Sequence, residues 1–187
     1  MTEKLSKRNL SSESSGQGLV QIFTGDGKGK TSAALGNVVR ALGHGLRVYI
    51  VFFMKGDYPY GERNTLSQLP NVTVASFGQE EFVDPRNIKL EQIANAGQAL
   101  SAAREALISC NYDIVILDEV NVAAAFKLIS VDDVIQLIND KPRNVELILT
   151  GRKADPRLIQ LADLVTEMVK IKHPYDNGIP ARKGIEY

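Results

Sequence analysis

The sequence contains very little cysteine, no tryptophan and no excess of either charge. Cys110 is the only cysteine among 187 residues, so a disulfide within the chain and a cysteine-based zinc or iron–sulfur site are excluded. We expect Cys110 to be a small buried hydrophobe. Twenty-two basic residues balance 22 acidic ones, whereas sequence-independent nucleic-acid binding needs an excess of Lys and Arg. We therefore expect no nucleic acid among the partners.

Long apolar runs are absent as well. No run approaches the roughly 20 apolar residues of a membrane-spanning helix, and the stretch 1–17 lacks the apolar core of a secretory signal. Hydrophobic residues make up 44% of the sequence and charged residues 24%, as in ordinary soluble proteins. These features predict a cytoplasmic protein that makes no membrane contact.

The composition changes near residue 18. Residues 1–17 are rich in Ser, Lys, Glu and Gly, and such a composition cannot bury enough apolar surface to order itself. We expect a flexible polar tail over 1–17. The remainder, 18–187, has the length of one domain with a full-sized core, and we expect a single domain there.

Short apolar runs alternate with segments of helical period after residue 18. The apolar runs cover residues 19–24, 47–53, 72–76, 113–117, 146–150 and 164–169. Residues 114–117 are continuously apolar, which is typical of strands buried on both faces. This alternation predicts the α/β class, with a mainly parallel central sheet of about six strands flanked by helices.

Three segments between the apolar runs have the features of helices. Segment 31–42 places Leu35, Val38, Val39 and Leu42 on one face, and segment 90–109 does the same with Ile93, Leu100, Ala103 and Leu107. These are the faces that we expect to be buried. A third helix is predicted to begin after Ser130 as its N-cap, with Asp133 at the positive helix end.

A glycine-rich turn joins the first predicted strand to the first helix. It reads Thr24-Gly25-Asp26-Gly27-Lys28-Gly29-Lys30-Thr31. Glycines let the backbone approach phosphate closely, and the N–H groups at the helix start form an anion cradle. Lys30 adds a positive charge, and Thr31 offers a hydroxyl to Mg²⁺. This segment predicts a P-loop NTPase-like fold that binds ATP.

The loop departs from the standard pattern G-x-x-x-x-G-K-[ST] at its first position, where Thr24 stands in place of glycine. The alternative interpretation is a glycine-rich turn that only links a strand to a helix. The strand before the loop and the helix after it favour phosphate binding.

A second signature lies at the end of the fourth apolar run, where Asp118 and Glu119 follow the strand. In P-loop enzymes an acid at this place helps to hold Mg²⁺, and strand ends of this kind border the ligand site of open α/β sheets. The alternative is two solvated acids. Either acid is a candidate metal ligand together with Thr31.

Several further segments resemble the P-loop-type ATP:corrinoid adenosyltransferases. They are the loop with Ser32, and residues 40–45 (RALGHG), 53–56 (FMKG), 61–64 (GERN), 117–119 (LDE), 149–152 (LTGR), 172–176 (KHPYD) and 183–187 (KGIEY). The resemblance covers residues 18–187. It implies transfer of the 5′-deoxyadenosyl group of ATP to the cobalt of a reduced corrinoid, with release of triphosphate. It also implies a homodimer, an electron donor for the cobalt, and ATP bound across the loop in an unusual direction.

The resemblance also assigns roles by position. It implies that the loop from Thr24 to Ser32 contacts the nucleotide, with Lys28, Lys30 and Thr31 as the catalytic groups. It implies a nucleotide contact for Arg40, whose alternative is an Arg on a helix surface, and a link to Mg²⁺ for Glu119. The cofactor and substrates expected are therefore Mg²⁺, ATP and the corrinoid.

One part of the family pattern is missing. Better-known members carry an aromatic pair that includes Trp between the third strand and the long helix, where it displaces the lower ligand of the corrin. Here the segment has Phe77 and Phe82 and no Trp. Phe82 is the candidate corrin contact; the alternative is that both rings pack into the core or a loop base. Tyr58 and Tyr60 belong to a loop that we expect to rim the site.

Two other functions fit a phosphate loop. One is a P-loop ATPase in which Glu119 activates water, and the other is a nucleotide-dependent corrinoid-binding module without turnover. The adenosyltransferase is favoured because the resemblance extends far beyond the loop.

Overall fold

A computed structural model describes residues 16–56, 59–79 and 81–187. Its six strands form one sheet in the order β3-β2-β4-β5-β1-β6, and each neighbouring pair is parallel. The strands are β1 (Val20–Thr24), β2 (Val48–Phe52), β3 (Val72–Ser76), β4 (Ile114–Asp118), β5 (Glu146–Thr150) and β6 (Leu164–Glu167). The predicted parallel sheet of about six strands is confirmed. Most of the predicted tail, residues 1–15, lies outside the described residues.

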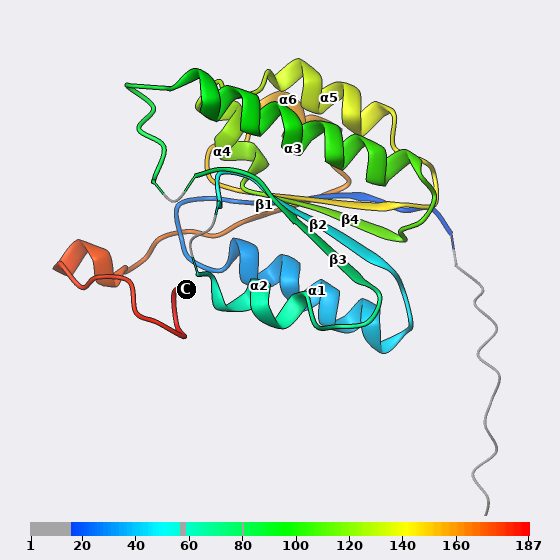
Figure 1. Ribbon diagram of the computed structural model, residues 1–187, viewed down its shortest axis with the longest axis horizontal. Coiled ribbons are helices and arrows are strands. Elements are labelled where there is room, and N and C mark those ends of the chain that lie inside the picture. Colours follow the sequence, from blue (N-terminus) through cyan, green and yellow to red (C-terminus); the bar gives the residue numbers. More distant parts are fainter. Residues whose placement is uncertain (1–15, 57–58, 80) are drawn as a thin grey trace, which may run out of the picture.

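Helices cover both faces of the sheet (Figure 1). One face carries α1 (Lys30–Gly43) and α2 (Gly61–Leu66). The other face carries α3 (Leu90–Ile108), α4 (Val120–Ala125), α5 (Val131–Asn139) and α6 (Pro156–Leu161). A 3₁₀-helix, η1 (Pro174–Asn177), lies in the segment that follows β6. No helix in the described part of the chain is long and apolar enough to cross a membrane.

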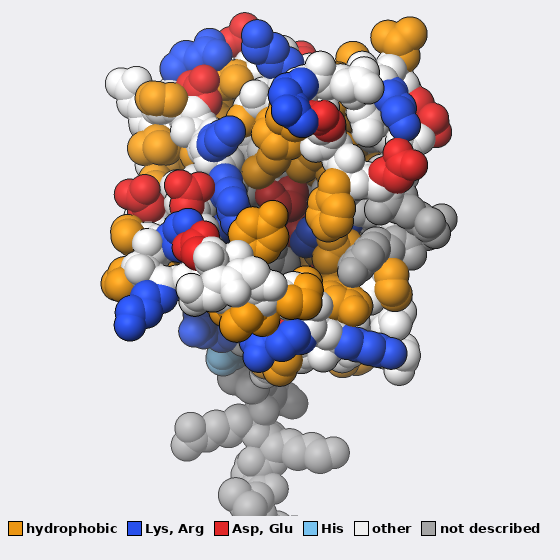
Figure 2. Space-filling view, turned by 90° about the vertical axis from the view of Figure 1, so that its left-hand side faces the viewer, with side chains coloured by type: hydrophobic (Ala, Val, Ile, Leu, Met, Phe, Trp, Pro, Cys, Tyr) orange, Lys and Arg blue, Asp and Glu red, His pale blue; other side chains and the backbone are white. Residues whose placement is uncertain are grey.

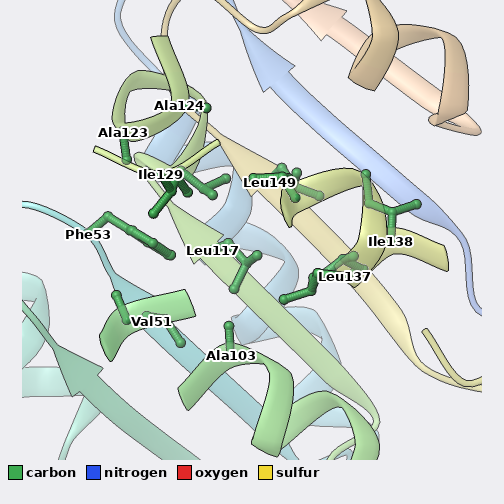
Figure 3. Packing of buried hydrophobic residues seen from close by; sticks show 14 of the residues in the cluster. Val51, Phe53, Ala103, Leu117, Ala123, Ala124, Ile129, Leu137, Ile138 and Leu149 are labelled. Carbon is green, nitrogen blue, oxygen red and sulfur yellow. The ribbon is translucent and has the colours of Figure 1, made fainter. Parts of the chain in front are cut away.

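The central strand β4 is buried on both faces, as its continuous apolar run predicts. Val115 and Leu117 belong to the core beneath α3, α4 and α5, whereas Ile114 and Ile116 belong to the core beneath α1. Figure 3 shows Leu117 between Val51 and Leu149 of the neighbouring strands, in the cluster that also contains Ala103, Ala123 and Leu137 of the covering helices. Full burial of one such side chain stabilises the fold by about 1.5–3 kcal/mol. This core fixes the carboxyl ends of β1, β2, β4 and β5 at one edge of the sheet.

The buried faces of two helices agree only in part with those predicted. Helix α1 buries Ala34, Val38 and Ala41, and Val39 is 70% exposed. Helix α3 buries Ala103 and Leu107, as predicted, together with further alanines, while Ile93 is 41% exposed. The prediction weighted the large aliphatic residues, but small residues let a helix approach the sheet closely, so the alanine stripes face the core.

The ends of two helices give one confirmation and one correction. Ser130 is the N-cap of α5, and its Oγ accepts a hydrogen bond from Asp133 N at 3.0 Å, as predicted. The prediction that Cys110 is buried is wrong, because Cys110 is exposed. It follows the last residues of α3 and has a φ of 58°, so it reverses the chain at the surface.

Candidate active site

The glycine-rich loop connects β1 to α1 and rests against the end of β6. Gly27 N donates to Met168 O at 2.6 Å, and Met168 N donates to Thr24 O at 2.8 Å. A Cβ atom would lie 2.5 Å from Met168 O at Gly25 and 2.7 Å from it at Gly27. Both positions therefore require glycine, because two backbones meet there.

Thr24 stands where the standard pattern has glycine, and its side chain has a structural contact. Its Oγ1 accepts a hydrogen bond from Ala154 N at 3.3 Å, and the residue is buried. The hydroxyl thus ties the start of the loop to the segment after β5.

Lys30 is the first residue of α1 and one of its buried residues. Its Nζ donates to Gly27 O at 2.6 Å, so the ammonium group lies within the loop. Burial lowers the pKa of Lys30, and the positive charge of Arg152 acts in the same direction. A cation held in this way, next to another cation, is stabilised by any anion that enters the loop.

The loop opens into a cavity of about 630 Å³, a volume typical of small-ligand sites. Figure 2 shows this edge of the sheet, with Lys and Arg side chains around a hollow and acidic atoms within it. The predicted site residues that line the cavity are Gly27, Lys28, Gly29, Lys30, Thr31, Ser32 and Glu119. Those that lie outside its lining are Thr24, Gly25, Asp26, Arg40, Phe82 and Asp118.

The two acids at the end of β4 have different surroundings. Asp118 is 1% exposed; its Oδ1 accepts from Thr150 Oγ1 at 2.7 Å, and its Oδ2 accepts from Lys55 Nζ at 2.6 Å. Glu119 adopts a φ of 65°, which turns the chain at the strand end, and it lines the cavity. Burial and the charge of Asp118 raise the pKa of Glu119. Of the two acids, Glu119 is therefore the one that lines the cavity.

Lys55 is a cavity residue to which the sequence reasoning gave no role. Its Nζ lies 4.8 Å from the centroid of the Tyr60 ring and 5.2 Å from that of Phe52. Burial lowers the pKa of Lys55, but the charge of Asp118 and their hydrogen bond outweigh this effect, so the pKa is raised. Lys55 is therefore a firmly charged ammonium group in the wall of the cavity.

Arg152 and the last residues of the chain also line the cavity. Arg152 follows Gly151, directly after β5, and its charge reaches both Lys30 and Glu119. Residues 184–187 form another part of the wall. The only sequence signal for Lys55, Arg152 and this segment was their place in the motifs 53–56, 149–152 and 183–187.

The remaining aromatic and basic candidates lie elsewhere. Phe77 packs against the core, whereas Phe82 is 85% exposed. Arg40 is exposed on α1, where its Nη1 donates to Asn37 Oδ1 at 3.1 Å. Tyr60 lines the cavity, as expected of a rim residue. Tyr58 lies outside the described residues.

Comparison with known proteins decides the family. The family model described as ATP:corrinoid adenosyltransferase BtuR/CobO/CobP matches residues 16–187. The chain belongs to this family. The match covers all six strands and the whole cavity wall, and it confirms the resemblance found in the motifs.

Curated members of the family are similar over nearly the whole chain. The corrinoid adenosyltransferase of Escherichia coli (strain K12) is 35% identical over 171 residues, which are 91% of this chain and 86% of that protein. The corrinoid adenosyltransferase of Pseudomonas aeruginosa is 36% identical over 171 residues, 91% of this chain and 84% of that protein. Corrinoid adenosyltransferase CobA of Salmonella typhimurium is 34% identical over 171 residues, 91% and 86% of the two chains.

Proposed function

We propose that the protein is an enzyme that transfers the 5′-deoxyadenosyl group of ATP to the cobalt of a reduced corrinoid. The observation that carries the proposal is the cavity in which the loop residues Gly27–Ser32 meet Glu119 and Arg152, in a chain whose family match extends from residue 16 to 187. The loop supports a nucleotide as one substrate, and the family membership supports a corrinoid as the other.

The triphosphate is proposed to lie on the loop. Backbone N–H groups at the start of α1 favour an anion there. Lys30 Nζ donates to Gly27 O, and a bound phosphate oxygen would replace Gly27 O as the acceptor. The guanidinium of Arg152 lines the same cavity and suits phosphate through its fixed donors. Nucleotide contacts by the loop residues from Thr24 to Ser32, and by Arg40, stay predictions for the bound state.

The donor set fits a magnesium ion that arrives with ATP. Glu119 and Thr31 both line the cavity and would supply a carboxylate and a hydroxyl, which are suitable oxygen ligands. Both oxygens of Asp118 are already hydrogen-bonded, so we place Glu119 nearer the metal. Within the described residues, no three His, Cys, Asp or Glu side chains group to hold a metal, which fits an ion held largely by phosphates and water. Mg²⁺ would neutralise charge on the triphosphate.

The chemical step needs positioning more than acid–base catalysis. The lone pair of Co(I) attacks C5′, the Co–C bond forms as the C5′–O bond breaks, and the triphosphate leaves with the electron pair of that bond. Cobalt is formally oxidised from Co(I) to Co(III). The corrinoid supplies the nucleophile, so the protein's part is to align C5′ and stabilise the departing charge with Lys30, Lys28 and Arg152. Alignment of this kind contributes about 7–11 kcal/mol.

The test is a reaction of the protein with ATP, Mg²⁺ and a chemically reduced corrinoid. The expected result is the absorption spectrum of a cobalt–carbon bond, together with one triphosphate per bond formed. Orthophosphate without the new bond would instead mean a P-loop ATPase, and binding without any product would mean a corrinoid-binding module.

The quaternary structure and setting are part of the same proposal. We expect a cytoplasmic homodimer that receives its reduced cobalt from a separate electron donor, because the family resemblance implies both a dimer and a Co(I) substrate. Sedimentation of the purified protein tests the dimer, and a monomer at micromolar concentration would contradict it.

A further inference from the structure

Residues 182–187, here called the clasp segment, form a turn that is closed by its own hydrogen bonds. Glu186 Oε2 accepts from Arg182 N at 2.8 Å and from Arg182 Nε at 3.2 Å. Gly184 N donates to Tyr187 O at 2.6 Å. The segment is therefore a preformed unit, although Arg182 and Lys183 are exposed.

The clasp segment is fastened to the phosphate-binding loop through Lys28. Lys28 Nζ lies 2.9 Å from Glu186 Oε1 and 3.2 Å from Ile185 O. Arg182 and Lys28 together lower the pKa of Glu186 to about 2, so its charge is present throughout the working pH range. In Figure 1 the end of the chain lies beside the first turn of α2, and Tyr187 C would lie 3.9 Å from a Cβ atom at Gly61.

This fastening makes the clasp segment a wall of the cavity. Residues 184–187 line it together with Tyr60, Gly61 and Glu62. Ile185 belongs to the cavity lining and is 60% exposed, so this apolar residue is accessible to a ligand. The phosphates have their own cradle on the loop, and an apolar surface offers nothing to a phosphate but suits a nucleoside.

We infer that the clasp segment is the nucleoside-side wall of the nucleotide site and that Glu186 is a positioning residue, which holds this wall in place through Lys28. The inference rests on the proposed use of ATP. It assigns Ile185 a contact with the nucleoside and leaves the phosphates to the loop. Because Lys28 and Arg182 both neutralise Glu186, the carboxylate serves this role without repelling the triphosphate.

The affinities of two different ligands distinguish the role of the clasp segment from that of the loop. ATP engages both, whereas inorganic triphosphate engages only the loop. For Ile185→Ala, we expect the Kd of ATP to rise about fivefold and that of inorganic triphosphate to change less than twofold, measured by calorimetry with Mg²⁺. The matched control is Ile179→Ala, since Ile179 is also exposed, at 46%, and lies outside the cavity lining. Equal losses for both ligands, or no loss for ATP, would overturn the inference.

Glu186→Gln tests the positioning role. We expect it to raise the Kd of ATP about threefold to tenfold while inorganic triphosphate binds as tightly as before or more tightly, because Lys28 is then released to the loop. Glu186→Asp keeps the charge and should recover part of the ATP affinity. Failure of Glu186→Asp to bind ATP better than Glu186→Gln would show that charge does not hold the wall.

Proteolysis gives a readout that does not depend on affinity. Trypsin cleaves after Lys183, which is exposed, and the loss of residues 184–187 is followed by mass spectrometry. Saturating ATP should slow this cleavage at least fivefold, and saturating inorganic triphosphate should slow it less than twofold. Equal protection by both ligands, or none by bound ATP, overturns the inference. Absence of ATP binding to the unaltered protein would instead refute the proposed function.

Discussion

Lys55 Nζ lies 2.6 Å from Asp118 Oδ2, and the pair is almost completely enclosed, with side-chain exposures of 11% and 1%. The pair joins the turn after β2 to the last residue of β4. These two strands are neighbours in the sheet, where Phe52 is paired with Asp118. Lys55 lines the cavity together with Glu119, so the ion pair holds one charged side chain of the cavity wall in place.

Removal of one partner of this pair should be costly. Asp118→Ala leaves the ammonium group of Lys55 buried without a counterion, and we expect the free energy of unfolding to fall by about 3–5 kcal/mol. Urea denaturation at pH 7 measures this loss. The double variant Lys55→Met, Asp118→Leu removes both charges and should be more stable than Asp118→Ala alone. A double variant that is less stable would contradict this account of the pair.

Lys30→Ala should nearly abolish adenosyl transfer and leave the fold intact, because the ammonium group lies inside the loop. The measurements are the rate of cobalt–carbon bond formation and the circular dichroism spectrum. Lys172→Ala is a suitable control, since Lys172 is exposed and lies outside the cavity lining; substitutions of this kind change stability by about 0.5 kcal/mol or less. Near-normal turnover of folded Lys30→Ala would remove Lys30 from the site.

Glu119→Gln should raise the Mg²⁺ concentration needed for half-maximal activity by about tenfold or more, since a carboxylate ligand becomes a neutral amide. Its effect on the KM of the corrinoid should be smaller. Glu62→Gln is the matched control, because Glu62 lines the same cavity from α2. If the Mg²⁺ dependence of Glu119→Gln equals that of the unaltered enzyme, Glu119 is not linked to the metal.

Phe82→Ala should slow adenosylation of a corrinoid that carries a lower ligand by about tenfold to a hundredfold, which corresponds to about 1.4–2.8 kcal/mol. A corrinoid supplied as Co(I) has no lower ligand and should be affected much less. Because Phe82 is 85% exposed, the substitution should change the free energy of unfolding of the protein by about 0.5 kcal/mol or less. Leu90→Ala is the control, as Leu90 is equally exposed. Equal losses with both substrates would assign Phe82 to general binding.

The ion pair of Arg47 with Asp113 predicts a pH-dependent contribution to stability. The side-chain hydrogen bonds from Arg47 lower the pKa of Asp113, against a smaller opposite effect of burial. A lowered folded-state pKa means that the contribution is present at neutral pH and is lost as the pH falls through that value. Asp113→Asn should reduce the unfolding free energy by about 0.5–1 kcal/mol at pH 7, given the exposure of Arg47. In acid-titrated urea melts, the difference from the unaltered protein should shrink below about pH 4; a constant difference would contradict the assignment.

The sheet was predictable because buried parallel strands have a strong local signal. The run 114–117 is apolar at every position, and all six predicted runs correspond to strands, with shifts of at most two residues at the ends. The short helices α2, α4 and α6 were not predicted, since six residues hold fewer than two helical turns and show little periodicity. The face of α1 was predicted only in part: Val38 is buried as expected, but the large, apolar Val39 is exposed, and the contact with the sheet also involves Ala34 and Ala41.

The candidate site was predictable where one short segment carries it. The loop from Gly27 to Ser32 is contiguous and lines the cavity, and its glycines and Lys30, between a predicted strand and a predicted helix, indicate a phosphate site. Lys55 and Arg152 come from separate strand ends, so only the order of strands in the sheet brings them to Lys30. The different roles of Asp118 and Glu119 depend on a φ of 65° at Glu119 and on the hydroxyl of Thr150, which neighbouring residues in the sequence do not reveal.

The contact of Gly27 with Met168 has a consequence for the order of events during synthesis. The loop is synthesised before the backbone against which it rests, because Met168 follows β6 in the chain. Domains fold as units once their chain is available. A nascent chain that stops before Met168 thus carries the complete loop sequence without the backbone that supports Gly27, and we expect the loop to reach its folded conformation only after Met168 has been made.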